Sequence, residues 1–301
     1  MSARWNNAMA LFFNSGAAAD PIYCRMRDGL EDHHVRGREY LERIWQEAGQ
    51  YVDPDSTQKA TLDLVSVFWE LQLAYAVKCA GRNVVPRDRL GYRNNKGPDL
   101  FADDPGVWLE AVVVRCGTGP DAIQYPEMMK AYSYDPDGVV LRLRSVIQDK
   151  SKKIQQYIKD GIIKPGHATV IAISGVALPH RFSGIFPPEI VRAVYPANHP
   201  VIEINRVTRV RSDSYIEYRD RVQKSLGAKV ATDVFLDPEF AHVSSVIYGE
   251  ADWVNPSSPP GSDFKIVHNF TALTPLPDGW FHAGDEYWWR DGALLERKRH
   301  A

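Results

Sequence analysis

The chain has 301 residues, of which 44% are hydrophobic and 25% are charged, and its formal net charge at pH 7 is −2. This is the composition of a globular protein with a substantial core, and it excludes a chain that is basic overall. The three cysteines, Cys24, Cys79 and Cys116, match neither a disulfide framework nor a zinc site of the CxxC type. Because no apolar stretch suits a signal peptide or a membrane span, we expect a cytoplasmic protein that does not enter membranes.

The N-terminal part of the chain predicts helices. Residues 1–27 lack periodicity and predict an irregular arm, whereas Glu31–Gln50 has helical spacing. A second helix is expected from Ser56 or Thr57 to Ala80, with an N-cap candidate at its start and Gly81 at its end. Three short strands separated by Gly and Pro turns are then expected, at Asn83–Arg87, Asp99–Ala102 and Val107–Arg115.

The next elements complete an α/β core. Residues 121–138 have no clear period and predict a loop, and a helix is expected over Val139–Asp160. Ala168–Ser174 is a continuous apolar run, which is typical of a strand covered on both faces, and we expect it beside Val107–Arg115.

The C-terminal third is harder to order. We expect strands at Val201–Ile204 and Ser244–Tyr248, a helix over Ser214–Leu226, and a hairpin over Glu286–Leu295 that turns at Asp291-Gly292. We therefore divide the chain into an N-terminal arm and helix (1–55), a core (56–200) and an α+β extension packed on the core (201–301).

Glu70 lies inside the long apolar run of the second predicted helix. A buried carboxylate costs several kcal/mol unless a proton, a partner or a metal compensates its charge. One explanation is a metal site, and the alternative is a structural ion pair with Arg82 or Lys78.

Two further acids follow at a suggestive spacing. Gly97-Pro98-Asp99 opens one short strand and Glu110 lies in the next, so the two acids can lie side by side on neighbouring antiparallel strands. Carboxylate oxygens are the ligands that Mg²⁺ and Mn²⁺ prefer. Taken alone, Pro98-Asp99 is also ordinary turn chemistry, but Glu110 in an apolar central strand is less easily explained.

This order of elements and acids resembles the PD-(D/E)xK nuclease superfamily over residues 57–174. Glu70 is similar to the acid of the first helix, Pro98-Asp99 to the PD element, and Glu110 to the acid of the (D/E)xK element. The resemblance implies an α/β, restriction-endonuclease-like core with helical N-terminal and α+β C-terminal extensions. It also implies that Glu70, Asp99 and Glu110 bind Mg²⁺ (or Mn²⁺) and that the protein is a DNA endonuclease.

The motif lysine is missing, because Val112 stands where the family pattern has it. Strand alternation places Arg115 on the face opposite Glu110, so Arg115 is no simple substitute. Lys150, by contrast, lies within the apolar stripe of the next predicted helix. In this superfamily the lysine can come from the following helix, so the resemblance implies a relocated catalytic Lys150, with Lys153 as the second candidate. The alternative is that Lys150 extends to solvent at the edge of the stripe.

The partners and the function stay open between alternatives. Basic residues gather at 142–164 and 206–224, which favours contacts with nucleic acid through Lys150, Lys152, Lys153 and the Arg206–Arg211 region, although a solvated helix face is the simpler interpretation. The oligomeric state is not predicted. The leading hypothesis is Mg²⁺-dependent hydrolysis of DNA. The alternatives are an interaction module of the same fold that has lost catalysis, which Val112 favours, and a metal-dependent hydrolase of another substrate.

The adjacent histidines His33 and His34 are a further candidate for a metal site. His33 and His34 are adjacent on a predicted helix, where neighbouring side chains point about 100° apart, so we expect a poor metal pair.

Overall fold

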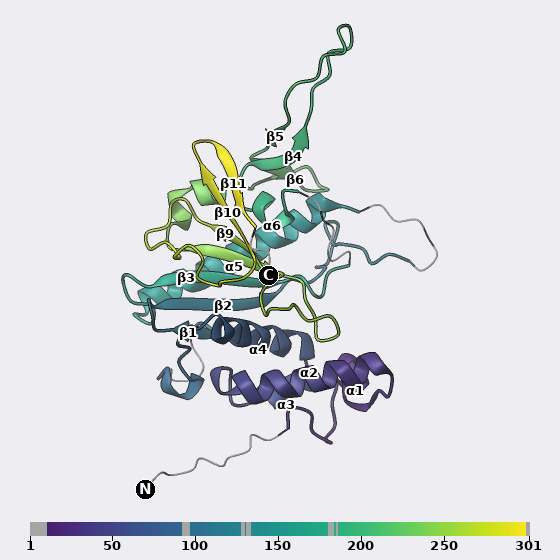
Figure 1. Ribbon diagram of the computed structural model, residues 1–301, viewed down its shortest axis with the longest axis vertical. Coiled ribbons are helices and arrows are strands. Elements are labelled where there is room, and N and C mark those ends of the chain that lie inside the picture. Colours follow the sequence, from purple (N-terminus) through teal and green to yellow (C-terminus); the bar gives the residue numbers. More distant parts are fainter. Residues whose placement is uncertain are drawn as a thin grey trace.

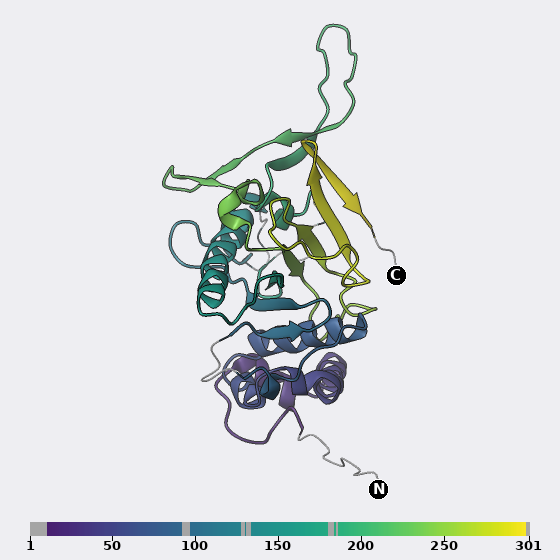
Figure 2. The ribbon, with the colours of Figure 1, turned by 90° about the vertical axis from the view of Figure 1, so that its left-hand side faces the viewer.

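A seven-stranded mixed sheet with helices on both faces organises the computed structural model, which describes residues 11–91, 97–127, 130, 134–179, 184 and 186–298. Figure 1 shows α4 beneath the sheet, with α1 and α2 forming a further layer below it, and Figure 2 shows α5 against the other face. The helices are α1 (Pro21–Asp28), α2 (Asp32–Ala48), α3 (Ser56–Ala60), α4 (Leu64–Cys79), α5 (Pro136–Lys159) and α6 (Glu189–Arg192). Short 3-10 helices lie at Gly49–Tyr51, Arg87–Arg89, Val234–Leu236 and Pro238–Phe240.

The sheet brings together strands from the middle and the end of the chain. In spatial order they are β1 (Leu100–Ala102), β2 (Val107–Val113), β3 (Ala168–Ser174), β8 (Ser245–Gly249), β9 (Lys265–His268), β10 (Asp285–Arg290) and β11 (Ala293–Arg297). Two separate hairpins pair β4 (Ala197–Val201) with β5 (Tyr215–Tyr218) and β6 (Arg221–Gln223) with β7 (Lys229–Ala231). Strands β8 to β11, from the segment expected as an extension, thus continue the sheet of the core.

The predicted order of helix, strands, helix and strand is present except at Asn83–Arg87, which forms no strand: only Val84 makes an isolated bridge, and Arg87 begins a 3-10 helix. Val84 forms an antiparallel bridge to Ala102, β1 pairs antiparallel with β2, and β2 pairs parallel with β3, with Glu110 opposite Ile171. The prediction that Ala168–Ser174 is a buried strand beside the one carrying Glu110 is confirmed. All seven of its residues are buried, because helices cover both faces of the sheet here.

Strand β2 divides two apolar cores. Leu109 and Ala111 pack with α4 and the N-terminal helices, whereas Trp108 and Val112 pack with α5. Since side chains alternate along a strand, Glu110 shares the α5 face with Trp108 and Val112. Position 110 is therefore aimed at the helix that carries the candidate lysines.

The N-terminal helices differ from the prediction in two places. Residues 1–10 lie outside the described residues, but the rest of the expected irregular arm contains α1, which begins after the N-cap Asp20. The single helix expected up to Ala80 is broken into α3 and α4. Asp63 has a non-helical backbone between them, and its side chain accepts a hydrogen bond from the Ser66 amide at 3.2 Å. Asp20 also accepts a hydrogen bond from the Leu64 amide at 2.7 Å. Two carboxylates therefore satisfy backbone amides at the start of α4 that have no partner within the helix.

The helix expected over Ser214–Leu226 is wrong, because this segment forms β5, β6 and their connection. Tyr215, Ile216 and Tyr218 are residues that favour strands, and pairing with β4 supplies their ladder. The predicted C-terminal hairpin is confirmed: Asp291 and Gly292 have φ of 51° and 74° between β10 and β11, as its two-residue turn requires.

The cysteines and the possibility of membrane-spanning helices can also be compared with the structure. The three cysteines are free thiols. Within the part of the chain that the structure describes, no helix combines the length and the apolar character needed to cross a membrane.

Candidate functional site

The candidate site is centred on Glu110 in the middle of β2. Its side chain is 1% exposed, and its Oε1 atom accepts hydrogen bonds from Lys150 Nζ at 2.6 Å and Lys153 Nζ at 2.8 Å. Its other oxygen, Oε2, is buried and has no hydrogen-bond partner among the described residues. An unsatisfied carboxylate oxygen in such a place is costly, so Glu110 carries one free acceptor for a ligand.

The two lysines reach Glu110 from one face of α5. They lie three positions apart on the helix, a spacing that stacks side chains on the same face. Lys150 is mostly buried and Lys153 is about half exposed, at 20% and 48%. The Lys153 ammonium also lies over the Tyr157 ring, 5.6 Å from its centroid. The expectation that Lys150 points toward the strand acid is therefore confirmed, and Lys153 points there as well.

Arg115 lies away from this group, as strand alternation predicts. Its guanidinium contacts the Asp63 carboxylate at 2.7 Å, at the start of α4 on the opposite face of the sheet. Val112, two residues after Glu110 on the same face of β2, packs against the α5-side core. The cation that approaches Glu110 is therefore supplied by the helix rather than by the strand.

Asp99 lies immediately before β1 and is fixed to β2. Its Oδ2 atom accepts a hydrogen bond of 2.6 Å from the amide of Ala111, the residue after Glu110. Part of its surface still meets solvent, but burial, and next the charge of Glu110, raise the pKa of Asp99 to about 7. Lys150 and Lys153 act in the opposite direction and lower this pKa. Asp99 therefore shares one electrostatic environment with Glu110 and both lysines.

Glu70 approaches the same environment from α4. Burial, and next the charge of Asp99, raise its pKa to about 8. The basic residues weighed as its structural partners have other contacts: Lys78 pairs with Glu47 at 3.2 Å, and Arg82 donates to the Trp280 carbonyl at 2.8 Å. The raised pKa favours the protonated, uncharged form of Glu70 near neutral pH. A bound cation would displace that proton.

The three acids are electrostatic neighbours but not one tight cluster. Asp99 interacts with both Glu70 and Glu110, yet the oxygens of all three do not lie within 4.8 Å of one another. A metal shared by all three would require the side chains to draw together.

A supporting group around Asp99 was missed by the sequence reasoning. Arg87 is buried, and it donates to Asp53 Oδ1 at 2.6 Å and to the Pro98 carbonyl at 2.6 Å. Lys59 contacts the other oxygen of Asp53 at 2.7 Å. Arg87 therefore joins the segment before α3 to the turn that presents Asp99. Its sequence signal, an arginine in a short β-type run before a Gly-Pro turn, is too common to have been singled out.

The histidine doublet is closer than expected. Glu31, His33 and His34 offer potential ligand atoms that all lie within 4.8 Å of one another, and the two rings are 3.9 Å apart between centroids. Both histidines belong to the first turn of α2, and His33 Nδ1 lies 3.3 Å from the carboxylate of the N-cap residue Glu31, so helical spacing alone did not predict this approach. Glu31 is exposed and the group lies apart from the acids above.

Ser151 and His242 form another pair that could suggest chemistry. Ser151 Oγ lies 2.9 Å from His242 Nε2, beside a cavity of about 460 Å³ at the starts of β3 and β8. The same nitrogen lies 3.1 Å from the Ser151 carbonyl, an acceptor, so it carries the proton and cannot act as a base toward Oγ. Ser151 is also buried, so this pair is structural.

Comparisons of the chain with models of protein families, with curated proteins and with solved structures found no match.

Proposed function

We propose that this protein is a metal-dependent phosphodiesterase that cuts DNA, built on a restriction-endonuclease-like core. The observation that carries the proposal is Glu110: a buried strand carboxylate with two helix lysines on one oxygen, the other oxygen free, and Asp99 bonded to the next residue of the strand. Burial of these charged groups costs free energy of folding, so a functional role explains them better than a structural role alone.

The chemistry of the three acids suits a hard divalent cation, and their side chains would draw together to hold it. Asp99 and Glu110, with Glu70 from α4, would hold Mg²⁺ or Mn²⁺, because these ions prefer carboxylate oxygens and Glu110 Oε2 is a free acceptor. Such an ion supplies Lewis-acid polarisation of a phosphate and a more acidic bound water.

The residues of the chain have separable roles in this proposal. Lys150 places a fixed positive charge at the mostly buried side of Glu110, where it would stabilise the negative charge that develops on a scissile phosphate. Lys153, being more exposed, would contact the incoming phosphate first. Asp99 and Glu70 would hold the cation in their deprotonated forms, so rising pH would favour binding.

A second candidate function is an interaction module of the same fold without catalysis. It is favoured by the double contact of Lys150 and Lys153 with Glu110, which compensates that charge with no metal present. In that case the acids and lysines would be a structural ion-pair group.

The test is cleavage of duplex and single-stranded DNA with Mg²⁺ or Mn²⁺ by the wild type, Glu110→Gln, Asp99→Asn and Lys150→Ala. We expect activity in the wild type and a loss of about 10²- to 10³-fold or more in each variant. Asp104→Asn, at an exposed acid between β1 and β2, is the matched control and should cleave normally. A folded wild type that neither cleaves any substrate nor binds Mn²⁺ in calorimetry would favour the interaction module.

A further inference from the structure

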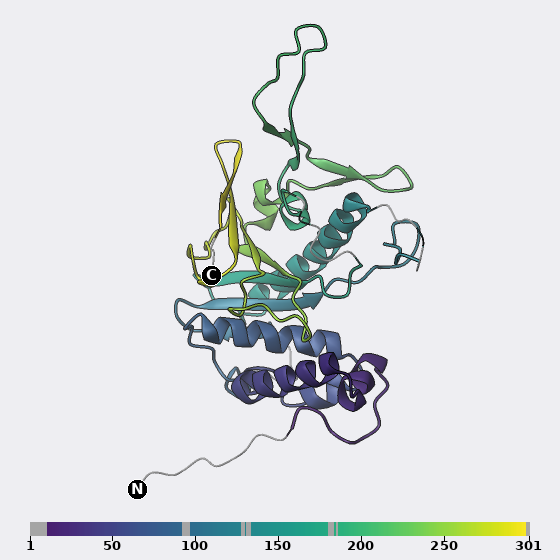
Figure 3. The same cartoon turned by 45° about the vertical axis from the view of Figure 1, so that its right-hand side comes forward.

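Two β-hairpins project from the end of the molecule opposite α1 and α2. The longer one, here the long arm, is the extension of β4 and β5 over residues 202–214, and the shorter one, the short arm, spans residues 221–231. Figures 2 and 3 show that the two arms leave the same corner in different directions, so that an open angle lies between them.

The long arm is ordered by its own hydrogen bonds out to the tip. Ile204 bridges to Arg211, the Asn205 amide donates to the Val210 carbonyl at 2.9 Å, and the Asn205 side chain accepts from the Val207 and Thr208 amides. Six residues separate Val201 from Val207, a reach of roughly 20 Å at about 3.3 Å per residue.

Both arms are basic although the chain as a whole is not. Residues 204–212 hold Arg206, Arg209 and Arg211 and no acid, and residues 221–231 hold Arg221, Lys224 and Lys229 and no acid. Each of these segments has a net charge of +3, and the whole long arm, which includes Glu203 and Asp213, has a net charge of +1, against −2 for the whole chain. The nearest acids in sequence lie at the bases of the arms, at Glu203, Asp213 and Asp220, and Asp220 is 3.8 Å from Arg221. No ion pair joins the three arginines of the long arm to another described residue.

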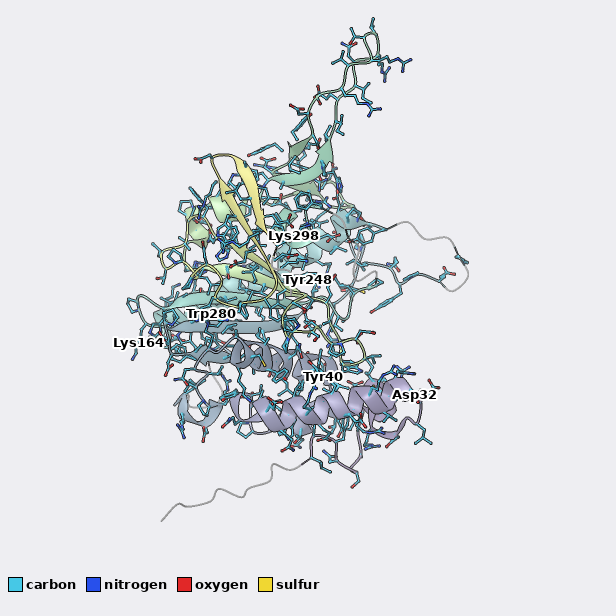
Figure 4. All side chains as sticks on the ribbon, viewed as in Figure 1. Asp32, Tyr40, Lys164, Tyr248, Trp280 and Lys298 are labelled. Carbon is cyan, nitrogen blue, oxygen red and sulfur yellow. The ribbon has the colours of Figure 1, made fainter. Side chains whose placement is uncertain are left out.

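Each arm also ends in an exposed aliphatic side chain. Val207 is 90% exposed and Leu226 is 83% exposed, and Val210 of the long arm is also exposed. Figure 4 shows the side chains of the long arm standing free of the body of the molecule. Exposed aliphatic groups among unpaired cations favour a partner that is both polyanionic and able to accept an apolar wedge.

We propose that the long and short arms clamp double-stranded DNA in the angle between them, with the arginines of the long arm in a groove and Val207 against the base steps. This inference rests on the proposed function, because it names the form of nucleic acid that the site would cut. Duplex DNA meets each requirement: its phosphates match the two basic segments, its minor groove attracts arginine, and its steps accept aliphatic wedges. A protein partner would not require two basic segments on an otherwise slightly acidic chain.

Helix α5 links the arms to the site. Arg144 on α5 donates through Nε to the carbonyl of Ala231, the last residue of the short arm, at 3.0 Å. Lys150 lies six positions further along the helix, about 9 Å at 1.5 Å per residue. The base of the short arm therefore lies about 9 Å along α5 from Lys150, so one helix connects the arms to the site.

The test measures binding without chemistry. Fluorescence anisotropy in EDTA would follow a labelled duplex of about 30 base pairs, roughly three helical turns, and the matching single strand. The variants are Arg206→Ala/Arg209→Ala/Arg211→Ala and, separately, Val207→Ser. The control removes three exposed cations on α1 and α2, at the end of the molecule opposite the arms (Figure 3), as Arg25→Ala/Arg36→Ala/Arg43→Ala.

We expect the triple arm variant to bind duplex at least tenfold more weakly than the control triple, with a salt slope of log affinity smaller by about 2.7 for three lost phosphate contacts. Val207→Ser should weaken duplex binding without changing that slope. Equal binding by the two triple variants, or equal binding of single strand and duplex by the wild type, would overturn the clamp. A change from dimer to monomer in the arm variant would assign the arm to a second copy of the chain instead. Because the binding assay is done in EDTA, its results can be interpreted even if the protein does not cleave DNA.

Discussion

The Nζ atom of Lys150 lies 2.6 Å from Oε1 of Glu110, which joins α5 to strand β2. Because Glu110 is almost fully buried, this contact compensates a charge that water cannot reach. Lys153 contacts the same oxygen at 2.8 Å, so both lysines compensate the charge of Glu110 in the folded protein.

We predict that removing these lysines destabilises the protein in a non-additive way. Lys150→Ala or Lys153→Ala alone should lower the free energy of unfolding by about 1 to 2 kcal/mol, with the exposed Lys153 at the lower end because solvent screens it. The double variant should lose about 3 to 5 kcal/mol, because it leaves Glu110 buried and unpaired. Urea unfolding measures each value.

Lys152→Ala is the matched control, since it is exposed on the same helix and gains the same helix propensity. It should change stability by no more than about 0.5 kcal/mol. Strictly additive losses in the double variant would show that Glu110 is compensated by something other than the two lysines.

The raised pKa values of Glu70 and Asp99 predict an unusual dependence of stability on pH. In the unfolded chain these acids titrate near 4, whereas burial and neighbouring carboxylates raise them to about 8 and about 7 in the fold. Between these limits the native state binds more protons than the unfolded state, so their contribution to stability falls as pH rises from about 4 to about 8. Asp99→Asn and Glu70→Gln should flatten this fall, measured by urea unfolding in EDTA at pH of about 5, 7 and 9.

The same linkage predicts how a metal acts. On the proposed function Mn²⁺ would displace these protons, so it should stabilise the wild type more at pH of about 8 than at about 6, and it should do so less in Asp99→Asn. Asp104→Asn, at an exposed acid, should follow the wild type in both experiments. Curves for Asp99→Asn and Glu70→Gln that run parallel to the wild type would contradict the raised pKa values.

Arg87 is predicted to support metal binding without touching the metal. It fixes the Pro98 carbonyl and Asp53, so Arg87→Ala should free the turn that presents Asp99. We expect Mn²⁺ affinity to fall about 10- to 100-fold, as for other outer partners of metal ligands, with partial recovery in Arg87→Lys.

Calorimetric titration of Mn²⁺ into the folded variants checks this prediction. Arg89→Ala is the control, because Arg89 is exposed in the same 3-10 helix and should leave the affinity unchanged. Unchanged affinity in a folded Arg87→Ala would make Arg87 a purely structural residue.

The features that could be predicted from sequence are those fixed by local pattern. Apolar continuity predicted β3 residue for residue, the Asp291-Gly292 pair predicted its hairpin, and the place of Lys150 in an apolar stripe predicted its contact with Glu110. In each case one periodicity or one turn type decides the structure without knowledge of distant residues.

The features that could not be predicted depend on residues far apart in the chain. Asp53 and Arg87 are 34 positions apart, and neither stands out until the fold brings them together. The pairing of β3 with β8 joins segments more than 70 residues apart, so the apparent C-terminal extension belongs to the same sheet. The strand propensity of Tyr215–Tyr218 also did not exclude a helix by itself. Pairing with β4, which the sequence does not reveal, decides the strand.

The break between α3 and α4 is the error with the clearest local cause, and it gives a last prediction. Asp63 caps α4 through the Ser66 amide, and it also pairs with Arg115. Asp63→Ala should lower the free energy of unfolding by about 0.5 to 2 kcal/mol through the lost cap. Asp63→Ser should restore much of this loss, because serine is also a good N-cap.

Two controls separate the cap from the ion pair. Arg115→Ala removes the exposed pair and a 3.5 Å contact with Ser66 Oγ, leaves the cap in place, and should cost at most about 1 kcal/mol. Asp55→Ala changes the N-cap residue of α3, whose side chain caps no amide, and should have little effect beyond its exposed contact with Lys59. A loss in Arg115→Ala equal to that in Asp63→Ala would show that the ion pair rather than the cap fixes the start of α4. If the cap is the cause, Asp63→Ala should also weaken Mn²⁺ binding relative to Arg115→Ala, because α4 carries Glu70.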